Sequence, residues 1–162
     1  MKLPPLPFPL ALNIGTDIVH LPRITRLITR PGGYLTRFTR RILTEQEQRD
    51  FRARFPLRPA NSDTVNPQKE GSGAPTRITP DMARWIAGRF AAKEAARKAA
   101  AAGAKGVGWK DVVVQVGGED GAEGRPEVVF FDPKREGDRG RVGRLSISHD
   151  GEYVVATVLA AG

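Results

Sequence analysis

The stretch GRFAAKEAARKA, residues 88–99, predicts a helix, and this helix constrains the fold more than any other segment. Thr79 is a suitable N-cap, Pro80 suits the first helical position, and Gly103 is expected to end the helix. Because most of its side chains are small, a neighbouring strand or a ligand can approach the helix closely. The sequence therefore predicts one long helix, running from residue 80 to about residue 103, as the centre of the fold.

The segments around this helix predict strands, and their order predicts the fold class. Leu12, Ile14 and Ile18 alternate with polar or small residues, as in a strand with one buried face. Asp150 and Gly151 form a tight-hairpin dipeptide between the last two apolar runs. Four strands are expected after the helix, at 109–116, 126–131, 144–149 and 152–160. This order of elements, in which one strand is followed by helices and then by hairpins, indicates an α+β fold with an antiparallel sheet.

Two shorter helices are predicted before the long one. The first begins near Pro22 and ends before Gly32. Thr44 followed three residues later by Glu47 is a capping-box pattern, which predicts a second helix over residues 45–55. In the first of these helices three arginines recur at helical spacing and form one basic stripe: Arg23, Arg26 and Arg30.

Length and composition limit the classes of function. The 162 residues, 40% of them hydrophobic, fit a single domain over 1–162, with a flexible polar insertion at about 56–79. The absence of cysteine excludes disulfides, a thiol nucleophile and cysteine-based zinc sites. A net charge of +8 indicates an anionic partner such as nucleic acid, a phosphorylated cofactor, an acidic protein or a membrane surface. No apolar run approaches the roughly 20 residues of a membrane-spanning helix.

Two acids are candidate ligands for a metal ion. Asp17 lies on the first strand, and Glu94 is the single acid of the alanine-rich stretch. Each also has an ordinary explanation: Asp17 as a cap for the helix near Pro22, and Glu94 as the partner of Lys98 in a surface ion pair. Two carboxylates with phosphate oxygens and water form the oxygen site that Mg²⁺ prefers. Metal-assisted phosphoryl transfer is therefore one function consistent with these residues.

Cations near Glu94 extend this hypothesis. Lys98 lies about 40° from Glu94 around the helix and shares its side, since each residue turns the helix by about 100°. Lys93 and Arg97 are explained at least as well as solvent-facing charges. His149 could contact a phosphate or a reacting hydroxyl, or bond the backbone at a hairpin end. Because adjacent strand residues point to opposite faces, the sequence SHD around it does not indicate a catalytic triad.

Several segments, in this order, resemble the holo-acyl-carrier-protein synthases, the short single-domain type of 4′-phosphopantetheinyl transferase. An aspartate in a G-x-D strand, a K-E-A-x-x-K helix and a serine–isoleucine–serine–histidine hairpin carry the resemblance. It covers nearly the whole chain apart from the N-terminal residues and the insertion. The similar segments are NIGTDIVHLPRI, RFTRRILTEQE, WIAGRFAAKEAARKA, WKDVVV and LSISHDGEYVVATV.

The resemblance implies a reaction and a set of site residues. It implies transfer of 4′-phosphopantetheine from coenzyme A to a serine of an apo acyl carrier protein, with a requirement for Mg²⁺. Asp17 and Glu94 would be the metal ligands, and Lys98 would neutralise charge on the attacked phosphate. Glu94 or a water on the metal would accept the serine proton. Three further residues are expected to contact the coenzyme: Arg89, His149 and Lys105, the last in the glycine-rich loop 103–108.

The resemblance also implies an assembly and a docking surface. Members of this type form homotrimers with active sites between subunits, and their first helix docks the acidic carrier, which would give the arginine stripe a purpose. Two alternatives remain at this point: a small basic nucleic-acid-binding protein, and an inactive transferase-like scaffold. The compartment, cytoplasmic or mitochondrial, and the pathway of the carrier, fatty acid biosynthesis or another, also remain open.

Overall fold

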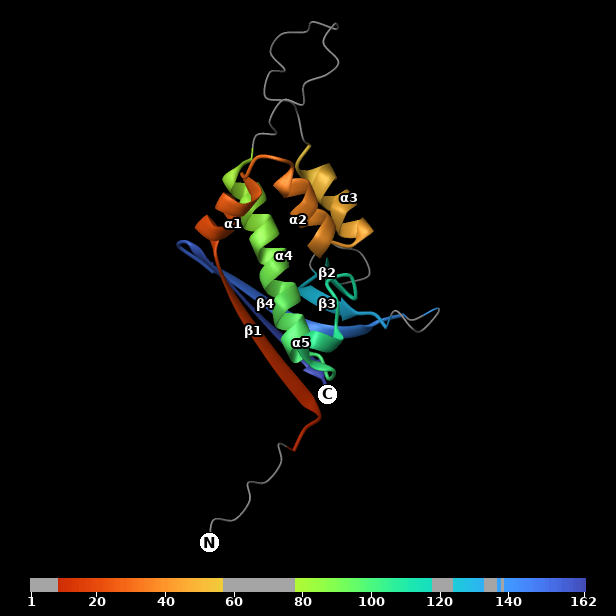
Figure 1. The fold of residues 1–162 in the computed structure, drawn as a ribbon. Helices are drawn as coiled ribbons and strands as arrows, with labels where there is room; N and C mark the ends of the chain where they lie inside the picture. Colours follow the sequence, from red (N-terminus) through yellow and green to blue (C-terminus); the bar gives the residue numbers. More distant parts are fainter. Residues whose placement is uncertain (1–8, 57–77, 118–123, 133–136, 138) are drawn as a thin grey trace, which may run out of the picture.

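A computed structural model describes residues 9–56, 78–117, 124–132, 137 and 139–162. These residues form one five-stranded antiparallel sheet in the order β1-β5-β4-β3-β2, and the long helix α4 lies across one face of it (Figure 1). The strands are β1 Leu12–His20, β2 Val112–Val116, β3 Pro126–Phe130, β4 Arg141–Asp150 and β5 Tyr153–Ala161. The helices are α1 Leu21–Ile28, α2 Tyr34–Ile42, α3 Glu45–Arg54, α4 Pro80–Ala99 and α5 Gly103–Gly106. The predicted α+β class is confirmed.

Helix α4 begins as predicted and ends earlier than predicted. The Thr79 hydroxyl accepts a hydrogen bond from the Met82 backbone N–H, and Pro80 occupies the first turn. The helix ends at Ala99 because the backbone of Ala100 turns to an extended conformation, with ψ of 141°. Gly103, at a φ of 68°, therefore does not end α4 but opens the short helix α5 after an intervening turn.

Strand β1 packs backbone to backbone against α4, and Gly15 makes this approach possible. A Cβ atom at residue 15 would collide with the backbone oxygen of Ala95 and the backbone nitrogen of Ala99. The strand itself was predicted, but the expectation that its alternation marks a buried apolar face is wrong for the single chain. Gly15 and Val19 face α4, whereas Ile14 and Ile18 lie on the open face and are 69% and 61% exposed.

Helices α1, α2 and α3 gather around the N-terminal half of α4, whereas α5 lies at its C-terminal end (Figure 1). Helices α1 and α3 match the predicted pair, and both halves of the Thr44–Glu47 capping box are present. Helix α2 was not predicted. Its signal was available, because its inward-facing residues recur at i, i+3, i+4 and i+7: Leu35, Phe38, Thr39 and Ile42.

The remaining strands form the two predicted hairpins. β2 pairs with β3, and β4 pairs with β5 around Gly151. The loop between β2 and β3 lies partly outside the described residues, as does the predicted insertion, of which residues 57–77 are not described. Among the helices of the described ranges, none has the length and apolarity to cross a membrane.

Candidate active site

Lys98 joins the long helix to the first strand through Asp17. Its Nζ donates to Asp17 Oδ1 and to the Thr16 carbonyl, both at 2.9 Å. Asp17 points toward α4 because it lies on the same strand face as Gly15, and its side chain is 17% exposed. The alternative that Asp17 caps the following helix is wrong, since the N-cap of α1 is His20 and makes no side-chain capping bond.

Glu94 has a different cationic partner from the one its spacing suggests. Its Oε1 accepts from Arg97 Nη1 at 2.8 Å, whereas Lys98 is occupied by Asp17. The ordinary explanation of Glu94 and Lys98 as a surface pair is therefore wrong. Each of the two candidate ligands has its own cation in the structure. Within the described ranges no three His, Asp or Glu side chains gather as a protein-only metal cage.

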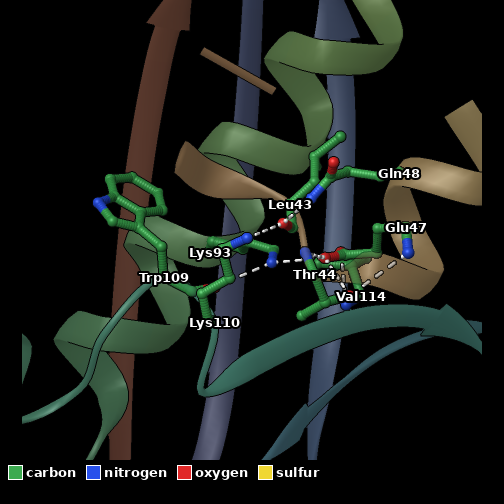
Figure 2. Close-up of polar contacts among 8 residues, drawn as sticks. All are labelled: Leu43, Thr44, Glu47, Gln48, Lys93, Trp109, Lys110 and Val114. Carbon is green, nitrogen blue, oxygen red and sulfur yellow. Dashed lines mark hydrogen bonds and ion pairs between the residues drawn. The ribbon is translucent and has the colours of Figure 1, made fainter. Parts of the chain in front are cut away.

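Lys93 is a buried charged residue, so the interpretation of Lys93 as a solvent-facing helix charge is wrong. Its side chain has no exposed surface, and its Nζ lies 2.6 Å from Glu47 Oε2 and donates to the Trp109 carbonyl at 3.0 Å (Figure 2). Glu47 also accepts from the backbone N–H groups of Thr44 and Val114. Burial lowers the pKa of Lys93, and the adjacent Glu47 carboxylate opposes that shift. This pair ties α3, α4 and β2 together.

A cleft of about 430 Å³ brings together two of the predicted coenzyme ligands, Arg89 and His149. The guanidinium of Arg89 lies 4.7 Å from the centroid of the Trp85 ring, and its Nε is buried with no hydrogen-bond partner in the described structure. Burial also lowers the pKa of Arg89. The complete lining is Arg54, Asp81, Arg84, Trp85, Gly88, Arg89, Ile147 and His149. The cleft is thus a strongly cationic site that sequence reasoning identified only in part.

The predicted site residues fall into two groups on different sides of α4. Glu94 follows Arg89 by five residues, which places it about 140° further around the helix. Neither Glu94 nor the Asp17–Lys98 pair lines the cleft. Lys105 is exposed on α5, beside the C-terminal end of α4. One chain therefore does not bring all of these residues into one site.

A second hollow, of about 420 Å³, is basic at its rim and aromatic at its base; we call it the α1–α2 groove. Of the three predicted docking arginines only Arg23 lines it. Arg26 donates to the Pro22 carbonyl, and Arg30 lies 5.7 Å from the Tyr34 ring. The lining is Arg23, Leu27, Tyr34, Arg37, Phe38, Arg41, Ile42, Phe90 and Trp109. Arg37 and Arg41 were missed because α2 was missed.

Comparison with known proteins identifies the family. Residues 13–158 match the model of the 4′-phosphopantetheinyl transferase superfamily. The chain is 66% identical, over the full length of both proteins, to 4′-phosphopantetheinyl transferase B, mitochondrial, of Aspergillus fumigatus. It is 36% identical to a holo-acyl-carrier-protein synthase of Gloeobacter violaceus, covering 93% of this chain and 92% of that protein.

A solved structure agrees with this assignment. A Bacillus anthracis holo-acyl-carrier-protein synthase in complex with CoA (3′,5′-ADP) superposes with a TM-score of 0.58 at 29% identity, covering 93% of this chain and 96% of that one. The chain therefore belongs to the 4′-phosphopantetheinyl transferase superfamily, as a member of the holo-acyl-carrier-protein synthase type. The resemblance found in the sequence is confirmed.

Proposed function

We propose that the chain transfers the 4′-phosphopantetheine group of coenzyme A to a serine hydroxyl of an apo acyl carrier protein. The products are the holo-carrier protein and adenosine 3′,5′-bisphosphate. The observation that carries the proposal is the contact of Lys98 on α4 with Asp17 on β1, with Glu94 one helical turn away. These are the residues that the family resemblance assigns to the phosphates of coenzyme A.

Asp17 and Glu94 fit a Mg²⁺ site that substrate phosphates complete. β1 and α4 run in opposite directions (Figure 1). Moving along the strand from Gly15 to Asp17 therefore leads the same way as moving back along the helix from Lys98 to Glu94. The first step is about 6–7 Å and the second about 5–6 Å. Mg²⁺ is commonly held by one or two carboxylates plus phosphates, and when bound it would neutralise charge on the pyrophosphate.

Lys98 is placed to meet the phosphate that the serine attacks. Its ammonium uses two of its three N–H donors on the Thr16 carbonyl and the Asp17 carboxylate, which leaves a third donor for a phosphate oxygen. Positioning and charge stabilisation of this kind carry most of the catalysis in phosphoryl transfer. Glu94 is the residue of this group that could accept the serine proton.

The cationic cleft is the proposed site for the adenosine end of the coenzyme. An anion there would satisfy the buried Arg89 Nε, which otherwise carries the cost of an unpaired donor. Arg54 and Arg84 add positive charge, and His149 adds a ring nitrogen to the same cleft. We propose that Lys105 contributes to binding the adenosine and its 3′-phosphate, on the basis of the resemblance alone.

We propose a homotrimer in which the cleft of one subunit faces the Asp17–Lys98 pair of the next. Two observations support it: the two groups of site residues lie on different sides of α4, and the open face of β1 and β5 carries several exposed apolar side chains. Large apolar patches on a monomer are typical of protein interfaces. The exposed apolar side chains of β1 and β5 are Leu12, Ile14, Ile18, Tyr153 and Leu159.

The α1–α2 groove is the proposed docking site for the carrier protein. Arg23, Arg37 and Arg41 would pair with acidic side chains of the carrier, and the aromatic base would receive an apolar one. Arg26 is exposed on α1, whereas Arg30 is exposed two residues after the end of α1 at Ile28, so the predicted stripe is not wholly helical. Both would steer the approach of an acidic partner, more strongly at low salt. Because the Aspergillus relative is named as mitochondrial, we infer that this protein is mitochondrial.

The experiment mixes the protein with coenzyme A, Mg²⁺ and an apo acyl carrier protein and measures the mass of the carrier. We expect addition of one phosphopantetheine group, lost on chelation of the metal and reduced at least 100-fold by Asp17→Ala or Glu94→Ala. Arg49→Ala, on the exposed side of α3, is the matched surface control. Undiminished transfer by both acid variants would refute the site. Salt-sensitive binding to random DNA without any transfer would favour a nucleic-acid-binding protein.

A further inference from the structure

Arg97 holds three acceptors at once, although its position in the helix suggested a solvent-facing charge. Its Nη1 donates to Glu94 Oε1 at 2.8 Å, its Nε to the Val107 carbonyl at 2.7 Å and its Nη2 to the Ala104 carbonyl at 2.8 Å. The guanidinium also lies 4.8 Å from the centroid of the Trp109 ring. Because a guanidinium is planar and rigid, these contacts fix the three acceptors relative to one another.

The two carbonyls belong to the segment that carries Lys105. α5 has four residues, and a helix this short is not stable without outside contacts. Arg97 supplies such contacts at Ala104 and Val107, and Lys93, one turn earlier on α4, holds the Trp109 carbonyl. Three backbone carbonyls of residues 104–109 therefore accept hydrogen bonds from side chains of α4, two of them from Arg97.

Arg97 engages one oxygen of Glu94 and leaves the other with no hydrogen bond in the described structure. A carboxylate on a long, flexible side chain is a weak ligand unless a neighbouring group orients it. Groups that orient metal ligands in this way typically change metal affinity 10–100-fold when they are mutated. The Arg97 and Glu94 side chains are 20% and 21% exposed, so the contact is largely shielded from solvent.

We propose that Arg97 is a positioning residue for the reaction. Its guanidinium orients the Glu94 carboxylate for metal binding and holds the segment that carries Lys105 next to Glu94. One side chain therefore fixes the positions of both the metal ligand and α5. This inference rests on the proposed function, because it takes Glu94 as a metal ligand. In this proposal Arg97 acts through the Glu94 carboxylate and the carbonyls of Ala104 and Val107.

The experiment compares Arg97→Lys, which keeps the charge and loses the planar fork, with Arg97→Ala and the wild-type protein. Mn²⁺ binding in the presence of coenzyme A, followed by the electron paramagnetic resonance signal of free Mn²⁺, is the main readout. Hydrogen exchange of the amides in residues 103–109 is the second. Arg49→Lys is the matched control, since Arg49 forms an exposed contact of the same spacing with Gln46 on α3.

We expect Arg97→Lys to remain folded, to weaken Mn²⁺ binding by about 10-fold or more and to speed exchange in residues 103–109. A merely structural role would lower the melting temperature without changing the Mn²⁺ affinity of the folded protein. Wild-type Mn²⁺ affinity in Arg97→Lys would overturn the inference and leave the proposed function intact. Wild-type protein that neither binds Mn²⁺ nor transfers phosphopantetheine would overturn both. If Arg97→Ala does not fold, Arg97→Lys alone decides.

Discussion

At the scale of single residues, the buried pair of Lys93 and Glu47 makes the sharpest stability prediction. Replacing Lys93 with methionine keeps the volume but leaves the Glu47 carboxylate buried without its cation. Removing one partner of a buried ion pair typically costs about 3–5 kcal/mol. We expect Lys93→Met to lower the free energy of unfolding, measured by urea denaturation, by about this amount.

Two further variants make this prediction specific. Lys110→Met removes an exposed lysine that donates to the Leu43 carbonyl and should cost about 1 kcal/mol. Combining Lys93→Met with Glu47→Gln should cost less than the sum of the two single changes, because the second change removes the unpaired charge. Strictly additive losses would contradict a direct coupling between Lys93 and Glu47.

Sequence reasoning could find some of these residues and not others, for a physical reason. Asp17 and Glu94 stood out because an acid in a basic, alanine-rich or glycine-flanked context is unusual in itself. Lys93 and Arg97 look like ordinary helix charges, since their partners are a carboxylate on α3 and carbonyls of residues 104–109. Burial of a charge depends on which distant segments pack over it, and helical spacing does not encode that information.

At the scale of elements, the close approach of β1 to α4 sets the distance between Asp17 and Lys98. Gly15→Ala puts a Cβ against the backbone of α4, which cannot move aside as a side chain can. Overpacking usually costs about 1–3 kcal/mol, and we expect this variant to reach or exceed the upper value. We also expect a loss of transferase activity, because the strand that carries Asp17 is displaced.

The matched control is Gly88, the glycine of α4 itself. A Cβ at Gly88 would meet no atom within 4 Å, so Gly88→Ala should raise the free energy of unfolding by up to about 1 kcal/mol through helix propensity. Thermal or urea unfolding of the two variants tests the pair. Equal effects of the two substitutions would show that the approach of β1 to α4 is not tight.

Local signals were enough to locate most elements, whereas contacts between distant segments decide which face of β1 is buried and where α4 ends. Capping residues located the start of α3 and of α4, and alternation located β1. Alternation did not tell which face of β1 is buried, because Gly15 can be covered by α4 only after both elements are in place. The end of α4 at Ala99 likewise follows from the turn into α5 and not from Gly103.

At the scale of the whole molecule, the apolar face of β1 and β5 predicts the assembly state. Ile14→Glu combined with Ile18→Glu places charges in the proposed interface, so we expect sedimentation to change from trimer to monomer. Val116→Glu is the matched control, because Val116 is 55% exposed on β2, at the opposite edge of the sheet. A wild-type protein that sediments as a monomer would contradict the assembly.

If each active site combines two subunits, two inactive variants should restore activity when they share an assembly. Asp17→Ala damages the β1 half of the site, and Arg89→Ala with His149→Ala damages the cleft half. With equal co-expression and random assembly, homotrimers included, each interface has one chance in four of joining two intact halves, so we expect about a quarter of wild-type transfer. If all of these residues instead served one site within a single chain, mixed trimers would transfer no more phosphopantetheine than the two parent variants. Transfer at parental levels by mixed trimers would therefore show that each chain carries its own complete site.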